Sequence, residues 1–281
     1  MSEKKLTYDY CDGLVQEFEE VIENPIRSRS SVYYTGVDLG TACVVVAVLD
    51  ENYRPVAGAY QYADVVRDGM VVDYIGAIHI IKKMKQELEE KLDTELIYAA
   101  AAIPPGTDRL DSGAIKNVVQ AAGFELTNLL DEPTAANEVL KMQNGAVVDI
   151  GGGTTGISVL KDGKVIHVVD EPTGGTHFSL VISGAYKIDF AEADQFKRDE
   201  KNHKELIPVL KPVVEKVASI ISRNIKDHHV EEISLVGGTS GLTGIENIIE
   251  EQTGIYTHKP MNPMFVTPLG IALSCQQEIM D

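Results

Sequence analysis

Hydrophobic and polar positions follow two periods along this chain of 281 residues. From residue 34 onward, short apolar runs alternate with segments whose apolar residues recur at helical spacing. Strands are expected near residues 34–41, 44–49, 56–60, 96–103, 124–130 and 232–236, with three more between 146 and 171. Helices are expected near 78–92, 112–122, 133–142, 206–226, 245–249 and 268–280, and from 178 onward. Strands and helices that alternate in this way predict an α/β layered fold.

The N-terminal segment, residues 1 to 31, has a pattern of its own. Apolar side chains recur there every four positions among acidic residues, at Leu6, Tyr10, Leu14, Phe18 and Ile22. This spacing predicts one amphipathic helix that ends before the Asn-Pro pair at residues 24 and 25. Such a helix either packs on its own domain or serves as a detachable helix that binds a partner. The Arg-Ser-Arg-Ser-Ser run that follows is typical of a linker.

The stretch of residues 147–160 places Asp149 at the end of an apolar strand and follows it with three glycines and two threonines. Without Cβ atoms, Gly151, Gly152 and Gly153 allow a tight turn in which successive N–H groups converge on an anion. No Gly-Lys-Ser/Thr closes the turn, and the next residues have a strand pattern, so the loop is expected at the tip of a β-hairpin. Taken alone, such a glycine-rich hairpin is more often ordinary turn chemistry than a phosphate site.

A second copy of the pattern lies about 110 residues earlier in the chain. Asp38 also follows an apolar strand and precedes an apolar residue and a glycine. In both copies a β-branched strand, a charged turn and another strand come next. The two units together predict an internal duplication in which each half carries its own hairpin loop and its own aspartate.

Composition narrows the classes of function. A formal net charge of −18 disfavours nucleic acid and anionic membranes as partners. The apolar runs are too short to cross a bilayer and the charged N-terminus does not fit a signal peptide, so we expect a cytoplasmic protein. The three separated cysteines, Cys11, Cys43 and Cys275, suit free thiols in a reducing compartment. Cys43 is either a redox switch or a packing thiol.

Five ordered motifs, from about residue 34 to the C-terminus, resemble the actin-like ATPase superfamily, which includes the seventy-kilodalton heat-shock chaperones, bacterial actin homologues and sugar kinases. Residues 36–41 and 147–155 are similar to its two phosphate loops, 99–106 with 121–136 to its inter-domain connection, 174–175 to a nucleotide-contact turn, and 235–244 to its adenosine loop. The Asp-Glu-Pro-Thr-Ala-Ala phrase at 131–136 is especially close to the chaperone branch. The resemblance implies an α/β, ribonuclease H-like fold with two duplicated domains around a nucleotide cleft.

The domain division implied by the resemblance has three parts. Residues 1–32 form a helical extension, residues 33–145 with 262–281 form domain I, and residues 146–261 form domain II.

The resemblance also implies a site for ATP or ADP with Mg²⁺. Asp38 and Asp149 would approach the metal from opposite domains, mostly through water, because Mg²⁺ keeps much of its hydration shell. Glu132 matches the carboxylate that positions the attacking water in the chaperones, and its alternative role is that of an acid at a helix N-terminus. The residues that would bind the nucleotide are Gly40, Thr41, Gly151, Gly152, Gly153, Thr154, Thr155, Gly174, Gly175, Gly237, Gly238 and Thr239.

Several positions depart from the chaperone pattern. Ala42 replaces a second threonine, residues 65–74 lack the expected phosphate-contacting lysine, His177 replaces an acid near the ribose, and Gly241 replaces an arginine against adenine. The connection between residues 178 and 206 is too short for a full adenine-covering subdomain, and residues 191–204 have the charge of solvated surface. These departures predict weak, open adenosine binding with slow hydrolysis or none.

The small size and the N-terminal extension are most similar to chaperone-like proteins associated with bacterial microcompartments, such as those of ethanolamine utilization. The resemblance implies an ATP-binding switch or slow ATPase that assists or reactivates a partner, either a microcompartment enzyme or a shell protein. The alternative is an actin-like assembly factor, scaffold or adaptor that binds nucleotide with little or no hydrolysis. A sugar kinase is disfavoured because no acceptor-directed aspartate stands out.

Overall fold

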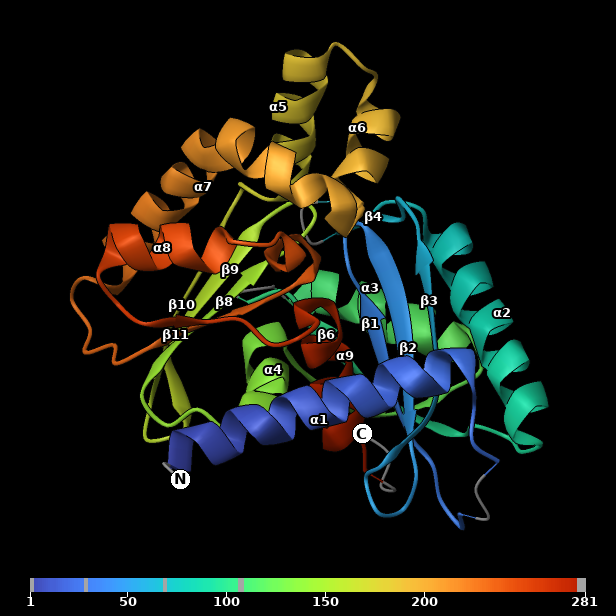
Figure 1. Cartoon of the computed structure of the whole chain (residues 1–281). Coiled ribbons are helices and arrows are strands. Elements are labelled where there is room, and N and C mark those ends of the chain that lie inside the picture. Colours follow the sequence, from blue (N-terminus) through green and yellow to red (C-terminus); the bar gives the residue numbers. More distant parts are fainter. Residues whose placement is uncertain (1–2, 28–29, 68–69, 106–108, 277–281) are drawn as a thin grey trace. The chain divides into compact units, whose positions relative to one another are not determined.

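The computed structural model describes residues 3–27, 30–67, 70–105 and 109–276 (Figure 1). The chain forms two compact units: unit 1 comprises Met1–Lys141 and Phe265–Asp281, and unit 2 comprises Met142–Met264. The N-terminal helix, expected as an extension, belongs to unit 1. Within the described ranges, no helix is long and apolar enough to cross a membrane.

Unit 1 contains a five-stranded sheet in the order β3-β2-β1-β6-β7. Strands β1, β2 and β3 are antiparallel, and β6 and β7 extend the sheet parallel to β1. The strands of unit 1 are β1 (Tyr34–Leu39), β2 (Cys43–Leu49), β3 (Pro55–Tyr62), β6 (Tyr98–Ile103) and β7 (Glu125–Asp131), with a small hairpin of β4 (Val66–Arg67) and β5 (Met70–Val71). Its helices are α1 (Glu3–Glu23), α2 (Tyr74–Leu92), α3 (Arg109–Ala121), α4 (Glu132–Leu140) and α9 (Val266–Ser274).

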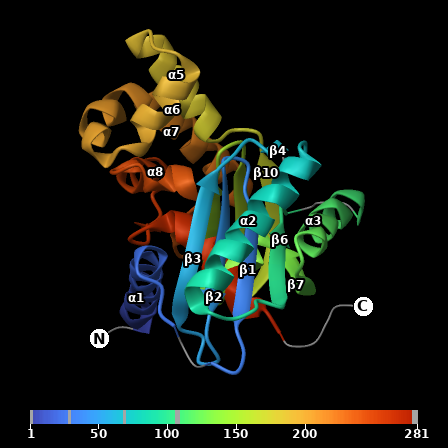
Figure 2. The same cartoon turned by 90° about the vertical axis from the view of Figure 1, so that its right-hand side faces the viewer.

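Helix α1 packs on β3, as Figure 2 shows, so its place in the structure is that of a helix packed on its own domain. The expected four-residue stripe is wrong in detail, because Tyr10 is exposed whereas Cys11 and Val15 are buried. Four residues turn a helix by about 400°, so a stripe at that spacing drifts away from the buried face. Phe18 is fully buried at the centre of this contact.

Unit 2 contains a second five-stranded sheet, in the order β10-β9-β8-β11-β12. Helices α5, α7 and α8 supply apolar side chains to its core, together with those of the strands. The strands of unit 2 are β8 (Gly145–Ile150), β9 (Thr155–Lys161), β10 (Lys164–Glu171), β11 (Ile233–Val236) and β12 (Thr257–His258). Its helices are α5 (Gly175–Tyr186), α6 (Phe190–Arg198), α7 (His203–Ile225) and α8 (Ile245–Thr253), with short 3-10 turns η1 (Glu200–Asn202), η2 (Gly238–Gly241) and η3 (Pro263–Phe265), the last of which ends at the first residue of the C-terminal part of unit 1.

The two sheets repeat one plan. Each begins with an antiparallel three-stranded meander, and in each the meander's first strand is then extended by two parallel strands. The two units are therefore duplicated α/β units, as the paired aspartate motifs predict, and this plan agrees with the actin-like ATPase fold that the resemblance implies.

Two sequence expectations need correction. The last helix ends at Ser274, where Cys275 takes an extended backbone, and residues 277–280 of the expected helix lie outside the described part of the chain. The charged segment 191–204 is not merely solvated surface, because it contains most of α6, and Ala193 and His203 are buried.

Candidate functional site

The two aspartates occupy the same position in their sheets. Asp38 lies opposite Val45 in the β1–β2 hairpin, and Asp149 lies opposite Gly156 in the β8–β9 hairpin. In each hairpin one more pair follows, and a four-residue loop then closes the turn. We call residues 40–43 loop 1 and residues 151–154 loop 2.

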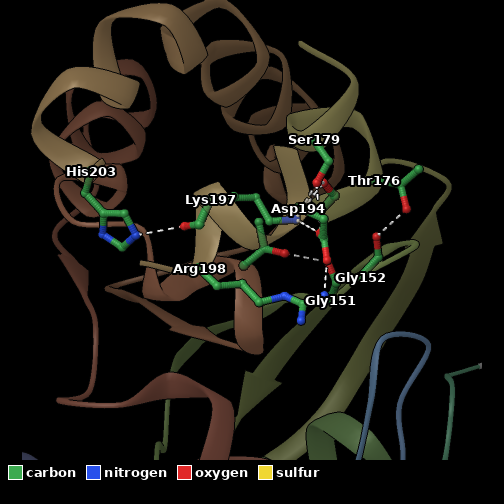
Figure 3. A network of polar contacts seen from close by, with 10 residues as sticks. Gly151, Gly152, Thr176, Ser179, Asp194, Lys197, Arg198 and His203 are labelled. Carbon is green, nitrogen blue, oxygen red and sulfur yellow. Dashed lines mark hydrogen bonds and ion pairs between the residues drawn. The ribbon is translucent and has the colours of Figure 1, made fainter. Parts of the chain in front are cut away.

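Two carbonyl groups of loop 2, those of Gly151 and Gly152, are held from outside the hairpin (Figure 3). Gly151 O accepts hydrogen bonds from Gly175 N–H at 2.9 Å and from Thr239 Oγ1 at 2.8 Å. Gly152 O accepts two from Thr176, one from its N–H at 2.8 Å and one from its Oγ1 at 3.0 Å. These four bonds use both lone pairs of each carbonyl oxygen and fix two successive peptide planes.

The same bonds determine where the loop N–H groups point. No described peptide bond is cis, and in a trans peptide the C=O and the following N–H point in opposite directions. Because the carbonyls of Gly151 and Gly152 point toward α5 and Thr239, the N–H groups of Gly152 and Gly153 point the other way. Two adjacent donors directed to one side of a glycine turn suit an anion such as a phosphate.

Asp149 lies against the first residue of the 237–241 turn. A Cβ built on Gly237 would be 2.1 Å from Asp149 Oδ1, and the φ of +87° at Gly237 is one that residues with a side chain rarely adopt. The glycine therefore allows the turn to approach the carboxylate directly. Asp149 and Gly237 are therefore neighbours in the structure although they are far apart in the sequence.

The remaining predicted residues of unit 2 have distinct places. Thr155 is buried and donates from Oγ1 to Thr173 O at 2.5 Å, so its hydroxyl is used inside the unit. Gly174 precedes the first turn of α5, and its N–H donates to His177 Nδ1 at 3.3 Å. Gly175 and Thr239 support loop 2, whereas Gly238 is exposed.

In unit 1 the predicted residues lie at two places. Asp38, Gly40 and Thr41 lie in or beside loop 1. Glu132 is the first residue of α4, after the N-cap Asp131, whose carboxylate accepts from Thr134 N–H at 3.0 Å. Glu132 is thus in the first helical turn, which is compatible with both roles considered for it.

Sequence reasoning missed a polar network beneath loop 2 (Figure 3). Lys197 Nζ donates to Gly175 O at 3.0 Å, to Ser179 Oγ at 2.8 Å and to Asp194 Oδ1 at 2.8 Å. Burial lowers the pKa of Lys197 to about 8. The signal was the helical spacing of Ala193 and Phe196, which pack against the core of unit 2 and give this charged segment an inner face.

The aspartates and the neighbouring loops are better suited to a nucleotide with Mg²⁺ than to a metal ion alone. Across the described ranges, no cluster of three His, Cys, Asp or Glu residues could hold an ion by itself. Proteins usually bind Mg²⁺ through one or two carboxylates, with waters and substrate phosphates completing the shell. Asp149 beside loop 2 is one such carboxylate in unit 2, and Asp38 beside loop 1 is one in unit 1.

Comparisons with known proteins identify relatives of this chain. The family model described as "Type IV pilus assembly protein PilM" matches residues 115–268. Ethanolamine utilization protein EutJ of Salmonella typhimurium is 44% identical over 253 residues, which are 90% of this chain and 88% of that protein. A chaperone protein HscA homolog of Vibrio vulnificus is 26% identical over 69% of this chain and 39% of its own length.

Solved structures of EutJ and of an actin-like protein are also similar to this chain. EutJ from Carboxydothermus hydrogenoformans has a TM-score of 0.91 and 45% identity, and the match covers 95% of this chain and 99% of that one. MreB5 of Spiroplasma citri, bound to ADP, has a TM-score of 0.69 with 18% identity, over 86% of this chain and 96% of its own. The second likeness concerns the fold alone.

Proposed function

The chain belongs to the EutJ family of ethanolamine utilization proteins and, through residues 115–268, to the wider group described by the PilM family model; from this membership we propose that it binds an adenine nucleotide with Mg²⁺ and acts as a chaperone-like switch. The observation that carries the proposal is loop 2. Its two outer N–H groups are fixed by four hydrogen bonds to the preceding carbonyls, and Asp149 lies next to the loop. A preorganised pair of donors binds an anion without a further ordering cost.

The predicted residues of the two loops and of the 237–241 turn have roles in this proposal. The N–H groups of Gly152 and Gly153 hold phosphate oxygens, and the backbone of loop 1 contributes in the same way. The resemblance assigns Asp38 and Asp149 as Mg²⁺ ligands, and the ion would neutralise phosphate charge and polarise the phosphoryl group when bound. The resemblance assigns the turn at Gly237 and Gly238 to the adenosine. The partner is proposed to be a protein of ethanolamine metabolism or of its compartment.

Isothermal titration with ADP and Mg²⁺ tests nucleotide binding. We expect the wild type to bind and Asp149→Ala to lose most of the affinity, because removal of a metal ligand leaves nucleotide charge unbalanced. Asp227→Ala is the matched control, since Asp227 is exposed beyond α7 and its loss should leave the affinity unchanged. A wild-type chain that gives no binding heat at millimolar nucleotide would refute the proposal.

Hydrolysis requires its own test at Glu132. If Glu132 positions the attacking water, Glu132→Gln should slow single-turnover hydrolysis by about a hundredfold, which is about 2.7 kcal/mol of barrier, with nearly unchanged nucleotide affinity. Glu138→Gln on the same helix is the control, because Glu138 forms an ion pair with Lys141 at the helix end instead. Equal rates in wild type and Glu132→Gln would remove the catalytic role.

A second candidate, an actin-like assembly or scaffold protein, is favoured by one surface of unit 1. Four large apolar side chains within six residues are exposed there: Met70, Val72, Tyr74 and Ile75, the last at 68%. Exposed apolar clusters of this kind are typical of protein contacts. Sedimentation with and without ATP and Mg²⁺ discriminates, since nucleotide-dependent polymers that Ile75→Ser abolishes would favour assembly.

A further inference from the structure

Two histidines of unit 2 lie with their rings against each other. The imidazoles of His167 on β10 and of His228, three residues beyond α7, have centroids 4.7 Å apart and planes inclined by 28°. Both residues are partly buried. Among the residues that the structure describes, neither ring has a hydrogen-bond partner. The ring nitrogens of both histidines are therefore available to a ligand.

A β-bulge directs His167 toward the helix side of the sheet. The register of β9 and β10 shifts between Val165 and His167, so that His167 pairs with Val159. Val159 belongs to the core that α7 helps to form, and paired residues point to the same face of a sheet. Without the shift Ile166 would take this place, yet Ile166 is 52% exposed. The strand thus exposes an isoleucine and turns a histidine inward, and bulges that re-aim a side chain in this way are frequent beside functional sites.

The end of α7 is fixed against the same strand by polar contacts. Arg223 Nη2 and Asn224 Nδ2 both donate to Glu171 Oε1, at 2.7 Å and 3.3 Å. Beyond the helix, His228 N–H donates to Ile225 O at 2.9 Å. The backbone on both sides of the ring pair is therefore held by contacts other than that of the rings, so that the two imidazoles are kept close to each other before any ligand binds.

The separation of the rings suits two imidazoles on one metal ion. A Zn–N bond of about 2.0–2.1 Å places each ring centroid about 3.2 Å from the ion, so two rings at square or tetrahedral positions lie about 4.5–5.2 Å apart. The observed 4.7 Å is within this range. The χ2 torsion of histidine has a broad minimum, so each ring can turn a nitrogen toward the ion at little cost in energy.

We propose that His167 and His228 together bind one divalent transition-metal ion of the class that takes imidazole nitrogen, such as Zn²⁺, and that this ion holds the end of α7 to the edge strand β10. Across the described part of the chain no set of three His, Cys, Asp or Glu residues surrounds one ion, so water completes the coordination shell. The net charge of −18 favours a cation. The ion is distinct from the Mg²⁺ of the proposed function, since Mg²⁺ prefers oxygen ligands.

Isothermal titration of the chelator-treated protein with Zn²⁺, without nucleotide, tests the site. His167→Asn and His228→Asn should each weaken binding by at least about tenfold, because even a change next to a metal ligand costs about 10–100-fold in affinity. His229→Asn is the matched control, since this neighbouring side chain is 86% exposed, and it should leave the affinity unchanged. Wild-type affinity in a folded His167→Asn would overturn the proposal. So would equal weakening by His228→Asn and His229→Asn, which would mean that the ion binds the exposed pair of adjacent histidines.

Electron paramagnetic resonance with Cu²⁺ keeps the test decisive even where His167→Asn or His228→Asn fails to fold. Cu²⁺ generally binds nitrogen ligands more tightly than Zn²⁺ does, and its spectrum reports the nitrogens bound to it. One equivalent of Cu²⁺ should show two imidazole nitrogens in the wild type and also in His229→Asn, whose change lies at an exposed position. A spectrum with a single imidazole nitrogen in either protein would overturn the proposal.

Thermal unfolding tests whether the ion joins the two elements. An ion that binds the folded unit stabilises it by mass action, so saturating Zn²⁺ should raise the unfolding temperature of the wild type by a few degrees and leave that of His167→Asn unchanged. An equal rise in both proteins would show that the stabilising ion binds elsewhere, and an unchanged wild type would show that no ion holds α7 to β10.

Discussion

Loop 1 and loop 2 have the same register but are anchored differently. In unit 1, Ala42 O accepts a hydrogen bond of 3.2 Å from Ala63 N–H, just beyond the neighbouring strand β3. In unit 2, α5 and Thr239 together make four bonds to the loop carbonyls. The difference follows from the connection after the third strand. In unit 2, α5 begins at Gly175, soon after β10 ends at Glu171, whereas in unit 1 the β4–β5 hairpin lies between β3 and α2. The duplicated part of each unit provides the strands and the loop. The segment that follows the third strand determines how many hydrogen bonds hold the loop.

The edge strands differ as well. The edge of β3 is covered, because α1 packs on it and Ile26 N–H donates to Val56 O at 2.8 Å. Its counterpart β10 carries a bulge between Val165 and His167 and exposes Ile166. Bulges and covering elements are two ways to prevent an edge strand from pairing with another chain. Both edge strands carry an irregularity, since β3 has one at Val56, but unit 1 adds a helix from outside the repeat.

The largest expected effect on stability comes from removing the contact between α1 and β3 in unit 1. Phe18→Ala should lower the free energy of unfolding by about 3–5 kcal/mol, because the buried ring lies so close to β3 that a Cβ on Gly58 would be 2.4 Å from Phe18 Cε2. Tyr10→Ala, at an exposed position of the same helix, should change it by less than about 0.5 kcal/mol. Urea unfolding measures both. Equal, small effects would make α1 a detachable helix after all.

The next effect concerns the turn at Asp149 in unit 2. Gly237→Ala should cost about 3 kcal/mol, since it adds backbone strain at φ +87° and places a methyl group against Asp149 Oδ1. Gly238→Ala is the matched comparison, because a Cβ there meets no atom within 4 Å. Thermal unfolding of the two variants checks the difference. Similar melting temperatures would show that the close approach to Asp149 is not required.

These contacts show what the sequence could and could not predict. The paired hairpins were predictable because an aspartate, an apolar residue and a glycine after a strand form a local signal that occurs twice. The anchoring of loop 2 was not, since Thr239 and Gly151 are 88 residues apart and their contact depends on how β11 pairs with β8. Lys197 was missed for a related reason: its charge indicates solvent, and only the packing of α6 shows that its three donors point inward.

A smaller effect distinguishes the contribution of Thr239 from that of α5 in holding loop 2. Thr239→Val removes one of two hydrogen bonds to Gly151 O and should cost about 1 kcal/mol, or about a fivefold loss of ADP affinity if the loop then relaxes. Ser234→Ala is the control, because the buried Ser234 hydroxyl has no hydrogen-bond partner in the described structure and its removal should not destabilise the unit. If Thr239→Val binds ADP like wild type, α5 alone suffices to hold the loop.

The smallest expected effect is protection of Cys43 by nucleotide, which tests whether loop 1 binds the same ligand as loop 2. Cys43 lies in loop 1 and is partly exposed, whereas burial raises the pKa of Cys11 to about 12 and also raises that of Cys275. Because the thiolate is the reactive form, a maleimide at pH 8 should modify Cys43 first, and the two buried cysteines serve as internal controls. ADP with Mg²⁺ should slow the modification of Cys43 several-fold, as read by peptide mass spectrometry, because a phosphate held by the loop backbone blocks access. A rate that saturating ADP leaves unchanged would restrict the anion site to loop 2, and the equal register of the two loops would then reflect shared descent without shared function.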